Sequence, residues 1–189
     1  MTVPGFQMNA RKLVVFLRAI NVGGHTVKMD ALKRLFEKMG FLEVETFIAS
    51  GNVIFGSAVK NPEAVEKTIS SGLKSALGYE VASFVRTLDE LAKTANYKAF
   101  PKAALESAAA LNVAFIHKTP DETSKRELMK LRTDIDDFAI NGREIYWLCR
   151  KRQSESDFSN AVFEKALGIS ATWRNINTVR KLAEKYPVK

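Results

Sequence analysis

The sequence holds very little cysteine or histidine. Cys149 is the single cysteine among 189 residues, and His25 and His117 are the two histidines. One thiol excludes an internal disulfide and any metal site built from several cysteines. Neither histidine belongs to a metal-ligand spacing such as H-x-x-x-H. We therefore expect no metal and no cofactor, and the residues leave open whether the chain catalyses a reaction.

Long hydrophobic runs are also missing. The apolar run at residues 13–17 is interrupted by Arg18, whereas a helix that crosses a bilayer needs about 20 apolar residues. No segment has the pattern of an export signal, and no Pro-, Gly- or Ser-rich linker interrupts the chain. The sequence therefore predicts a globular cytoplasmic protein that does not enter a membrane.

The charge is unbalanced toward lysine and arginine. The formal net charge is +8, which favours contact with anions such as nucleotides or nucleic acid. However, the basic residues are spread along the chain with acidic residues among them, as on solvated helix faces. The composition permits nucleic-acid binding without favouring it.

The first half alternates between strand and helix patterns. Ser50-Gly51-Asn52 is a hairpin signal between two β-rich runs. Pro62 is typical of a helix start, and Gly78 of a helix end. The predicted order is strand, helix, strand, strand, helix, strand, at residues 13–18, 29–39, 44–48, 53–55, 62–77 and 79–86, with a further helix from Leu88 to about Ala95.

The second half repeats this order. Asn141-Gly142 is among the strongest two-residue hairpin signals. The predicted elements are a strand at 111–116, a helix at 122–131, strands at 138–140 and 144–148, a helix at 158–167, an extended piece at 171–175 and a helix at 179–186.

Three pairs of segments coincide between the halves: Ser50-Gly51 with Asn141-Gly142, residues 74–78 with 164–168, and residues 87–93 with 178–184. We therefore predict an α+β fold of two tandem ferredoxin-like βαββαβ units, each with an antiparallel sheet and helices on one face. The predicted units span residues 11–95 and 111–189, with residues 96–110 as the connection.

The loop after the first strand distinguishes the halves. It runs from residue 19 to 27, whereas its counterpart is a short loop around residues 118–120. Gly23 and Gly24 allow close backbone approach, and the loop leads into a helix N-terminus, which favours an anion. Because the first two strands of the unit run parallel, the hairpin lies at the same sheet end. The candidate ligand-binding residues are Arg18, Asn21, Gly23, Gly24, Ser50 and Asn52. In the structural alternative, Ser50 and Asn52 only form a turn and Asn21 only closes its loop.

A second polar segment occurs at residues 172–178. Asn177 or Thr178 is a natural N-cap for the last helix. Capping at those positions leaves Arg174 and Asn175 unexplained, so both are further candidate ligand-binding residues.

Residues 17–25, 47–55 and 171–179 together resemble the bacterial domain-of-unknown-function family 1697. The resemblance implies a ferredoxin-like α+β fold in an uncharacterised cytoplasmic protein. It carries no established reaction, cofactor or catalytic residue.

Three functions remain open. The first is binding of a small anionic ligand, a nucleotide or phosphorylated compound, at the loop and hairpin. The second is a protein-interaction or oligomerisation module. The third is nucleic-acid binding on an open sheet face, for which Phe16, Phe47, Phe55 and Phe115 are the available aromatics.

Overall fold

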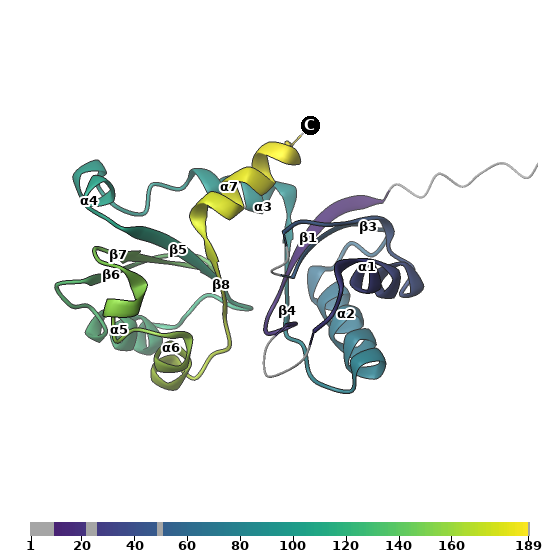
Figure 1. Ribbon diagram of the computed structural model, residues 1–189, viewed down its shortest axis with the longest axis horizontal. Helices are drawn as coiled ribbons and strands as arrows, with labels where there is room; N and C mark the ends of the chain where they lie inside the picture. The colour runs from purple at the N-terminus through teal and green to yellow at the C-terminus, as the bar shows by residue number, and fades with distance from the viewer. Residues whose placement is uncertain (1–9, 22–25, 49–50, 189) are drawn as a thin grey trace, which may run out of the picture. The chain divides into compact units, whose positions relative to one another are not determined.

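The chain folds into two compact units, Met1–Leu88 and Asp89–Lys189. The computed structural model describes residues 10–21, 26–48 and 51–188. Each unit is built on a four-stranded antiparallel sheet (Figure 1). The βαββαβ order occurs twice, which confirms the predicted pair of tandem ferredoxin-like units. No helix in the described part of the chain is long and apolar enough to cross a membrane.

The first unit has the strand order β2-β3-β1-β4. Two helices cover one face of its sheet, where α1 packs on β2 and α2 packs on β4. Its elements are β1 (Arg11–Leu17), α1 (Met29–Lys38), β2 (Leu42–Thr46), β3 (Asn52–Ser57), α2 (Pro62–Leu77) and β4 (Ser83–Thr87).

The central strand β1 is apolar on both faces, which explains its unbroken hydrophobic run. Val15 belongs to the core that includes Phe36 of α1 and Ile69 of α2. Val14 and Phe16 point to the opposite face by the alternation of a strand, and both are fully buried. A strand buried on both faces reads as a continuous apolar run.

The second unit repeats the sheet with the order β6-β7-β5-β8. Its elements are α3 (Leu88–Asn96), α4 (Lys102–Glu106), β5 (Ala110–Phe115), α5 (Glu122–Lys130), β6 (Asp136–Asn141), β7 (Glu144–Cys149), the 3₁₀ helix η1 (Gln153–Glu155), α6 (Asn160–Leu167), β8 (Thr172–Asn175) and α7 (Ile176–Lys185). The sequence did not predict α4. It spans five residues and has no side-chain cap, so its periodicity is too short to recognise.

Helices α3 and α7 belong to the second unit by their contacts. The hydroxyl of Tyr146 donates to the Thr94 carbonyl oxygen at 3.1 Å, and Nε of Arg180 donates to the Ala95 carbonyl oxygen at 3.3 Å. Burial raises the pKa of Tyr146, so its hydroxyl keeps the proton that it donates. Cys149 on β7 is buried, as an unreactive core thiol would be.

The strand registers show which residues are equivalent in the two units. Leu13 lies opposite Phe55 and Thr87, and Asn112 lies opposite Trp147 and Asn175. Thr87 ends β4 directly before α3, and Asn175 ends β8 directly before α7. Thr87 therefore corresponds to Asn175, whereas the sequence match paired it with Thr178. A shift of three residues is close to one helical turn. Such a shift keeps the apolar residues of the two helices on the same face, so the displaced sequence match still aligned apolar with apolar positions.

The register also shows that the two hairpin glycines, Gly51 and Gly142, are not equivalent. The Gly51 carbonyl oxygen accepts from the Leu17 nitrogen at 2.8 Å, and the Arg143 carbonyl oxygen accepts from the Ile116 nitrogen at 3.1 Å. Gly51 is therefore equivalent to Arg143, and Gly142 lies one position earlier.

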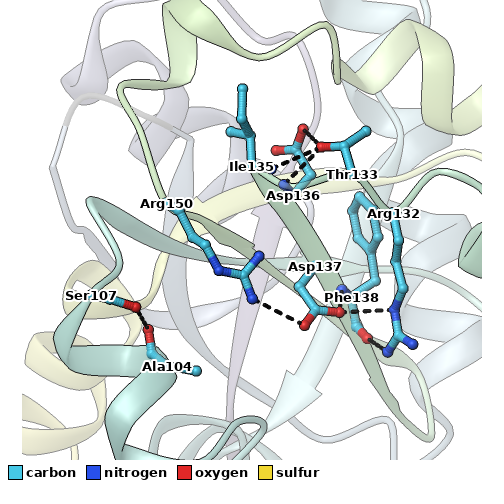
Figure 2. Close-up of polar contacts among 9 residues, drawn as sticks. All are labelled: Ala104, Ser107, Arg132, Thr133, Ile135, Asp136, Asp137, Phe138 and Arg150. Atoms are coloured by element: carbon cyan, nitrogen blue, oxygen red, sulfur yellow. Dashed lines mark hydrogen bonds and ion pairs between the residues drawn. The ribbon is translucent and has the colours of Figure 1, made fainter.

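The edge strand β6 has side chains bonded to its outward main-chain groups (Figure 2). Nη2 of Arg132 donates to the Phe138 carbonyl oxygen at 2.9 Å, and Oδ1 of Asp137 accepts from the Phe138 nitrogen at 2.9 Å. Thr133 Oγ1 accepts from the Asp136 nitrogen at 3.0 Å. Such contacts block the pairing of another strand.

The edge strand β2 is protected differently. Its pairing with β3 shifts register between Leu42 and Glu45, and Glu43 adopts a left-handed conformation with φ of 48°. A bulge of this kind bends an edge strand and disrupts its ladder.

We predict that Arg132→Ala increases self-association, because it frees the Phe138 carbonyl oxygen at an exposed edge. The variant also loses the ion pair of Arg132 with Asp137, so the free energy of unfolding falls by about 1 kcal/mol. Light scattering against protein concentration measures the first effect. Arg126→Ala is the control, because Arg126 contacts Thr123 within its own helix. Equal association of both variants would contradict the edge role.

We predict that Asn112→Leu stabilises the protein. Nδ2 of Asn112 is buried and has no hydrogen-bond partner in the described part of the chain, and the equivalent residue in the first unit is Leu13. A buried unpaired polar group costs about 1–3 kcal/mol, so chemical denaturation gives a gain of about 1 kcal/mol after some loss to tighter packing. Leu13→Asn makes the reverse change and destabilises. A loss of stability in Asn112→Leu would show that the amide has a structural use.

Candidate functional site

The end of β1 and the β2–β3 hairpin meet at one end of the first sheet, as the sequence predicted. The Leu17 nitrogen bonds the Gly51 carbonyl oxygen, and the Phe47 nitrogen donates to the Asn52 carbonyl oxygen at 2.9 Å. Gly51 has φ of +73°, and a Cβ at this position would lie 2.8 Å from Cγ2 of Ile20. Only glycine fits this close approach without a shift.

Three polar contacts fix the base of the loop after β1. Oδ1 of Asn21 accepts from the Val27 nitrogen at 2.7 Å and so bridges the loop. The Tyr79 hydroxyl donates to the Ile20 carbonyl oxygen at 3.1 Å. The Arg18 nitrogen donates to the Ala82 carbonyl oxygen at 2.9 Å. Sequence reasoning missed Tyr79, which lies beyond α2 and had no motif around it.

The residues predicted for this site differ in how far they are exposed to solvent. Arg18 is half-buried and Asn21 is exposed. Asn52 is fully buried, and its Nδ2 donates to the Phe47 carbonyl oxygen at 2.9 Å, so its amide group holds the hairpin together. Gly23, Gly24 and Ser50 lie outside the described residues.

Two residues beside these loops have unusual backbone conformations. Ala19 has φ of 58°, and Ile48 has φ of 57°. A left-handed β-branched residue is rare, and such conformations cost on the order of 1–3 kcal/mol each. Ile48 is also 54% exposed. The fold therefore holds strained backbone at both the loop and the hairpin.

The helix that follows the loop begins without a side-chain cap. Lys28 occupies the N-cap position of α1, and its side chain makes no cap hydrogen bond. The equivalent helix in the second unit is α5, where Oδ1 of Asp121 accepts from the Ser124 nitrogen at 2.7 Å. This backbone hydrogen bond lowers the pKa of Asp121. Each helix has one acid in its first turn, Asp30 or Glu122, so the two helices differ in the cap.

Arg174 lies buried in the second unit. Its Nη1 donates to Thr172 Oγ1 at 2.9 Å and to the Trp173 carbonyl oxygen at 2.8 Å. Burial lowers the pKa of Arg174 to about 10, so the guanidinium stays charged at neutral pH.

Arg86 is the equivalent residue in the first unit. Arg86 lies opposite Val14 as Arg174 lies opposite Val113. Its Nη1 donates to the Val85 carbonyl oxygen at 2.9 Å, which repeats the contact of Arg174. Sequence reasoning missed this pair because its match between the halves was displaced by three residues. The sequence feature that could have identified the pair is that each arginine lies two residues before the start of a helix.

Asn175 is the N-cap of α7. Its Oδ1 accepts from the Asn177 nitrogen at 2.9 Å, so the sequence assignment of the cap to Asn177 or Thr178 was wrong. The last strand runs into α7 without a linker, and the helix therefore begins earlier than its pattern indicated. Arg174 and Asn175 both belong to the second unit.

No cluster of three or more His, Cys, Asp or Glu residues suited to a metal ion occurs in residues 10–21, 26–48 and 51–188.

The fold has a counterpart among solved structures, a conserved bacterial protein, SP0830, from Streptococcus pneumoniae. The two chains are 20% identical, with a TM-score of 0.71 over 93% of this chain and 98% of that one. At this identity the similarity shows the fold alone. No curated protein matches the chain. The family model described as a protein of unknown function (DUF1697) matches residues 10–146, which is most of the chain, and the chain therefore belongs to this family.

Proposed function

We propose that the protein binds a small anionic ligand, a nucleotide or a phosphorylated compound, in the first unit. The site is the end of the first sheet where the β1–α1 loop and the β2–β3 hairpin meet. We propose that it acts in the cytoplasm, as the sequence suggested.

The observation that supports this most is the difference between the starts of α1 and α5. In the second unit the Asp121 carboxylate occupies the helix N-terminus, and in the first unit Lys28 stands at the equivalent position without a cap bond. The free N–H groups and the dipole of a helix start favour negative charge. The Lys28 side chain therefore leaves to an external anion the position that the Asp121 carboxylate fills in the second unit.

Charge and backbone geometry add support. Lys28 is exposed at the helix start, and Arg18 directly follows β1 where the loop begins. The left-handed conformations of Ala19 and Ile48 lie at the loop and the hairpin. Strained backbone of this kind clusters at ligand sites.

The aromatic residues considered for nucleic-acid binding are largely inaccessible to solvent. Phe16, Phe55 and Phe115 are each fully buried, and Phe47 is half-buried. Base stacking requires aromatic rings that solvent can reach. The interaction-module alternative makes no demand on the α1 start, so the variants below separate it from ligand binding.

A thermal-shift panel of inorganic phosphate, nucleotides and sugar phosphates tests the proposal at low and moderate salt. A ligand at a hundred times its Kd adds about 2.7 kcal/mol, which corresponds to a rise of about 5–10 °C at this size. A rise that survives salt supports the proposal. A rise with RNA alone that salt removes would favour nucleic acid, and a flat panel would favour an interaction module.

We predict that Lys28→Asp abolishes the response to the anion that shifts the wild-type protein most. An aspartate at the N-cap accepts from the first-turn N–H groups, as Asp121 does in α5. The free energy of unfolding rises by about 1 kcal/mol. Lys28→Ala is the matched control, because it removes the lysine charge without adding a cap. We expect Lys28→Ala to keep part of the affinity for this anion, as measured by calorimetry. Equal affinity of Lys28→Asp and the wild-type protein would remove the α1 start from the site.

We predict that Gly51→Ala weakens the same ligand at least about tenfold. The new Cβ meets Ile20 and forces the loop base away from the hairpin. Gly142→Ala is the control, because Gly142 also has positive φ but an added Cβ there would meet only Oε2 of Glu144, at an ordinary contact distance of 4.0 Å. Both variants lose about 1 kcal/mol of stability from the left-handed conformation. A loss of affinity in both, or in neither, would contradict the role of the hairpin.

A further inference from the structure

A pocket of about 440 Å³ lies within the second unit, apart from the anion site. Its walls come from the end of α5, the α5–β6 loop, η1 and the start of α6. Pockets that hold small molecules have volumes of about 300–1,000 Å³.

The floor of the pocket is apolar. Phe158 packs its ring on Phe138 and Trp147 at centroid distances of 4.8 and 4.7 Å. Val162, at the start of α6, is 37% exposed beside it, and Leu131 closes the α5 side. An aliphatic or aromatic group placed here is removed from water on its inner side.

The two walls are held together by a buried carboxylate. Asp136 accepts from Nε1 of Trp147 at 2.7 Å, from Oγ of Ser156 at 2.7 Å and from Oγ1 of Thr133 at 3.2 Å. Oγ of Ser156 in turn accepts from the Phe158 nitrogen at 2.9 Å. These bonds join the loop before β6 to the segment before α6, so the pocket is formed before any ligand arrives.

The rim of the pocket is acidic. Asp134, Glu155 and Asp157 line it together with Lys130. Nζ of Lys130 bonds Glu127 at 2.6 Å and is engaged there. Among the described residues, the carboxylates of Asp134 and Asp157 form no hydrogen bond and no ion pair. In a chain of net charge +8, an acidic rim beside an apolar floor selects positive charge.

We propose that this pocket binds a small organic cation, an ammonium or guanidinium group on an apolar body. The cationic group lies between Asp134 and Asp157, and the apolar body lies on Phe158 and Val162. The site is independent of the anion site in the first unit.

The test titrates the full chain with phenethylamine at low salt and follows binding by calorimetry and by tryptophan fluorescence, since Trp147 contacts the Phe158 ring. Two ligands of similar size probe the charge: 2-phenylethanol is neutral and 3-phenylpropionate is anionic. We expect phenethylamine to bind and to lose affinity at high salt, and the other two to bind at least about tenfold more weakly.

Two kinds of variant locate the site. Asp134→Asn with Asp157→Asn removes both charges and reduces the affinity about tenfold. Val162→Phe fills the pocket and abolishes binding. Glu184→Gln, an exposed acid on α7, is the matched control and keeps wild-type affinity. Thermal unfolding of each variant, with Tm near that of the wild-type protein, shows that the fold is intact.

The proposal is overturned if phenethylamine does not bind at millimolar concentration, if 3-phenylpropionate binds as tightly, or if the double variant and Val162→Phe keep wild-type affinity. Lys28→Asp keeps phenethylamine binding, so failure at one site is distinguishable from failure at the other.

Discussion

Each unit depends on a central strand that is hydrogen-bonded on both sides. β1 pairs with β3 and β4, and β5 pairs with β7 and β8. Because main-chain bonds fix both neighbours at once, the register decides which residues share a face and where each loop leaves the sheet. The meeting of the first loop with Gly51 follows from this pairing. The equivalence of Arg86 and Arg174 follows from the same pairing together with the helix that begins two residues after each arginine.

The duplication gives the protein an internal comparison. One scaffold carries Leu13 in the first unit and Asn112 in the second, and it starts equivalent helices with Lys28 in one and Asp121 in the other. A feature that the fold required would occur in both copies. The polar residues that occur in one copy are therefore the best markers of specialisation, and on them rest the proposals of an anionic ligand in the first unit and a cationic ligand in the second.

The fold was predictable because its signals are local. Gly78 and Gly168 end their helices in the left-handed conformation that a glycine C-cap indicates. For the candidate site, only its location at one end of the first sheet was predictable, because the directions of the strands bring the hairpin next to the loop. Its contacts were not predictable, because Tyr79 reaches Ile20 across 59 residues. The pocket around Phe158 was also missed, because Asp134 and Asp157 look like ordinary solvated acids until the fold places them around one cavity.

The two protected edge strands also matter while the chain folds. Two copies of one strand order in a single chain offer each other wrong partners, and misassembly between repeats is a characteristic failure of such proteins. The bulge in β2 protects one edge of the first sheet, and the side chains of Arg132 and Asp137 protect one edge of the second by unlike means. If β2 forms before its own sheet is complete, it cannot pair regularly with β6, because side chains already bond the outward main-chain groups of β6. The divergence of these two edges thus disfavours a mixed sheet in which β2 of one copy pairs with β6 of the other.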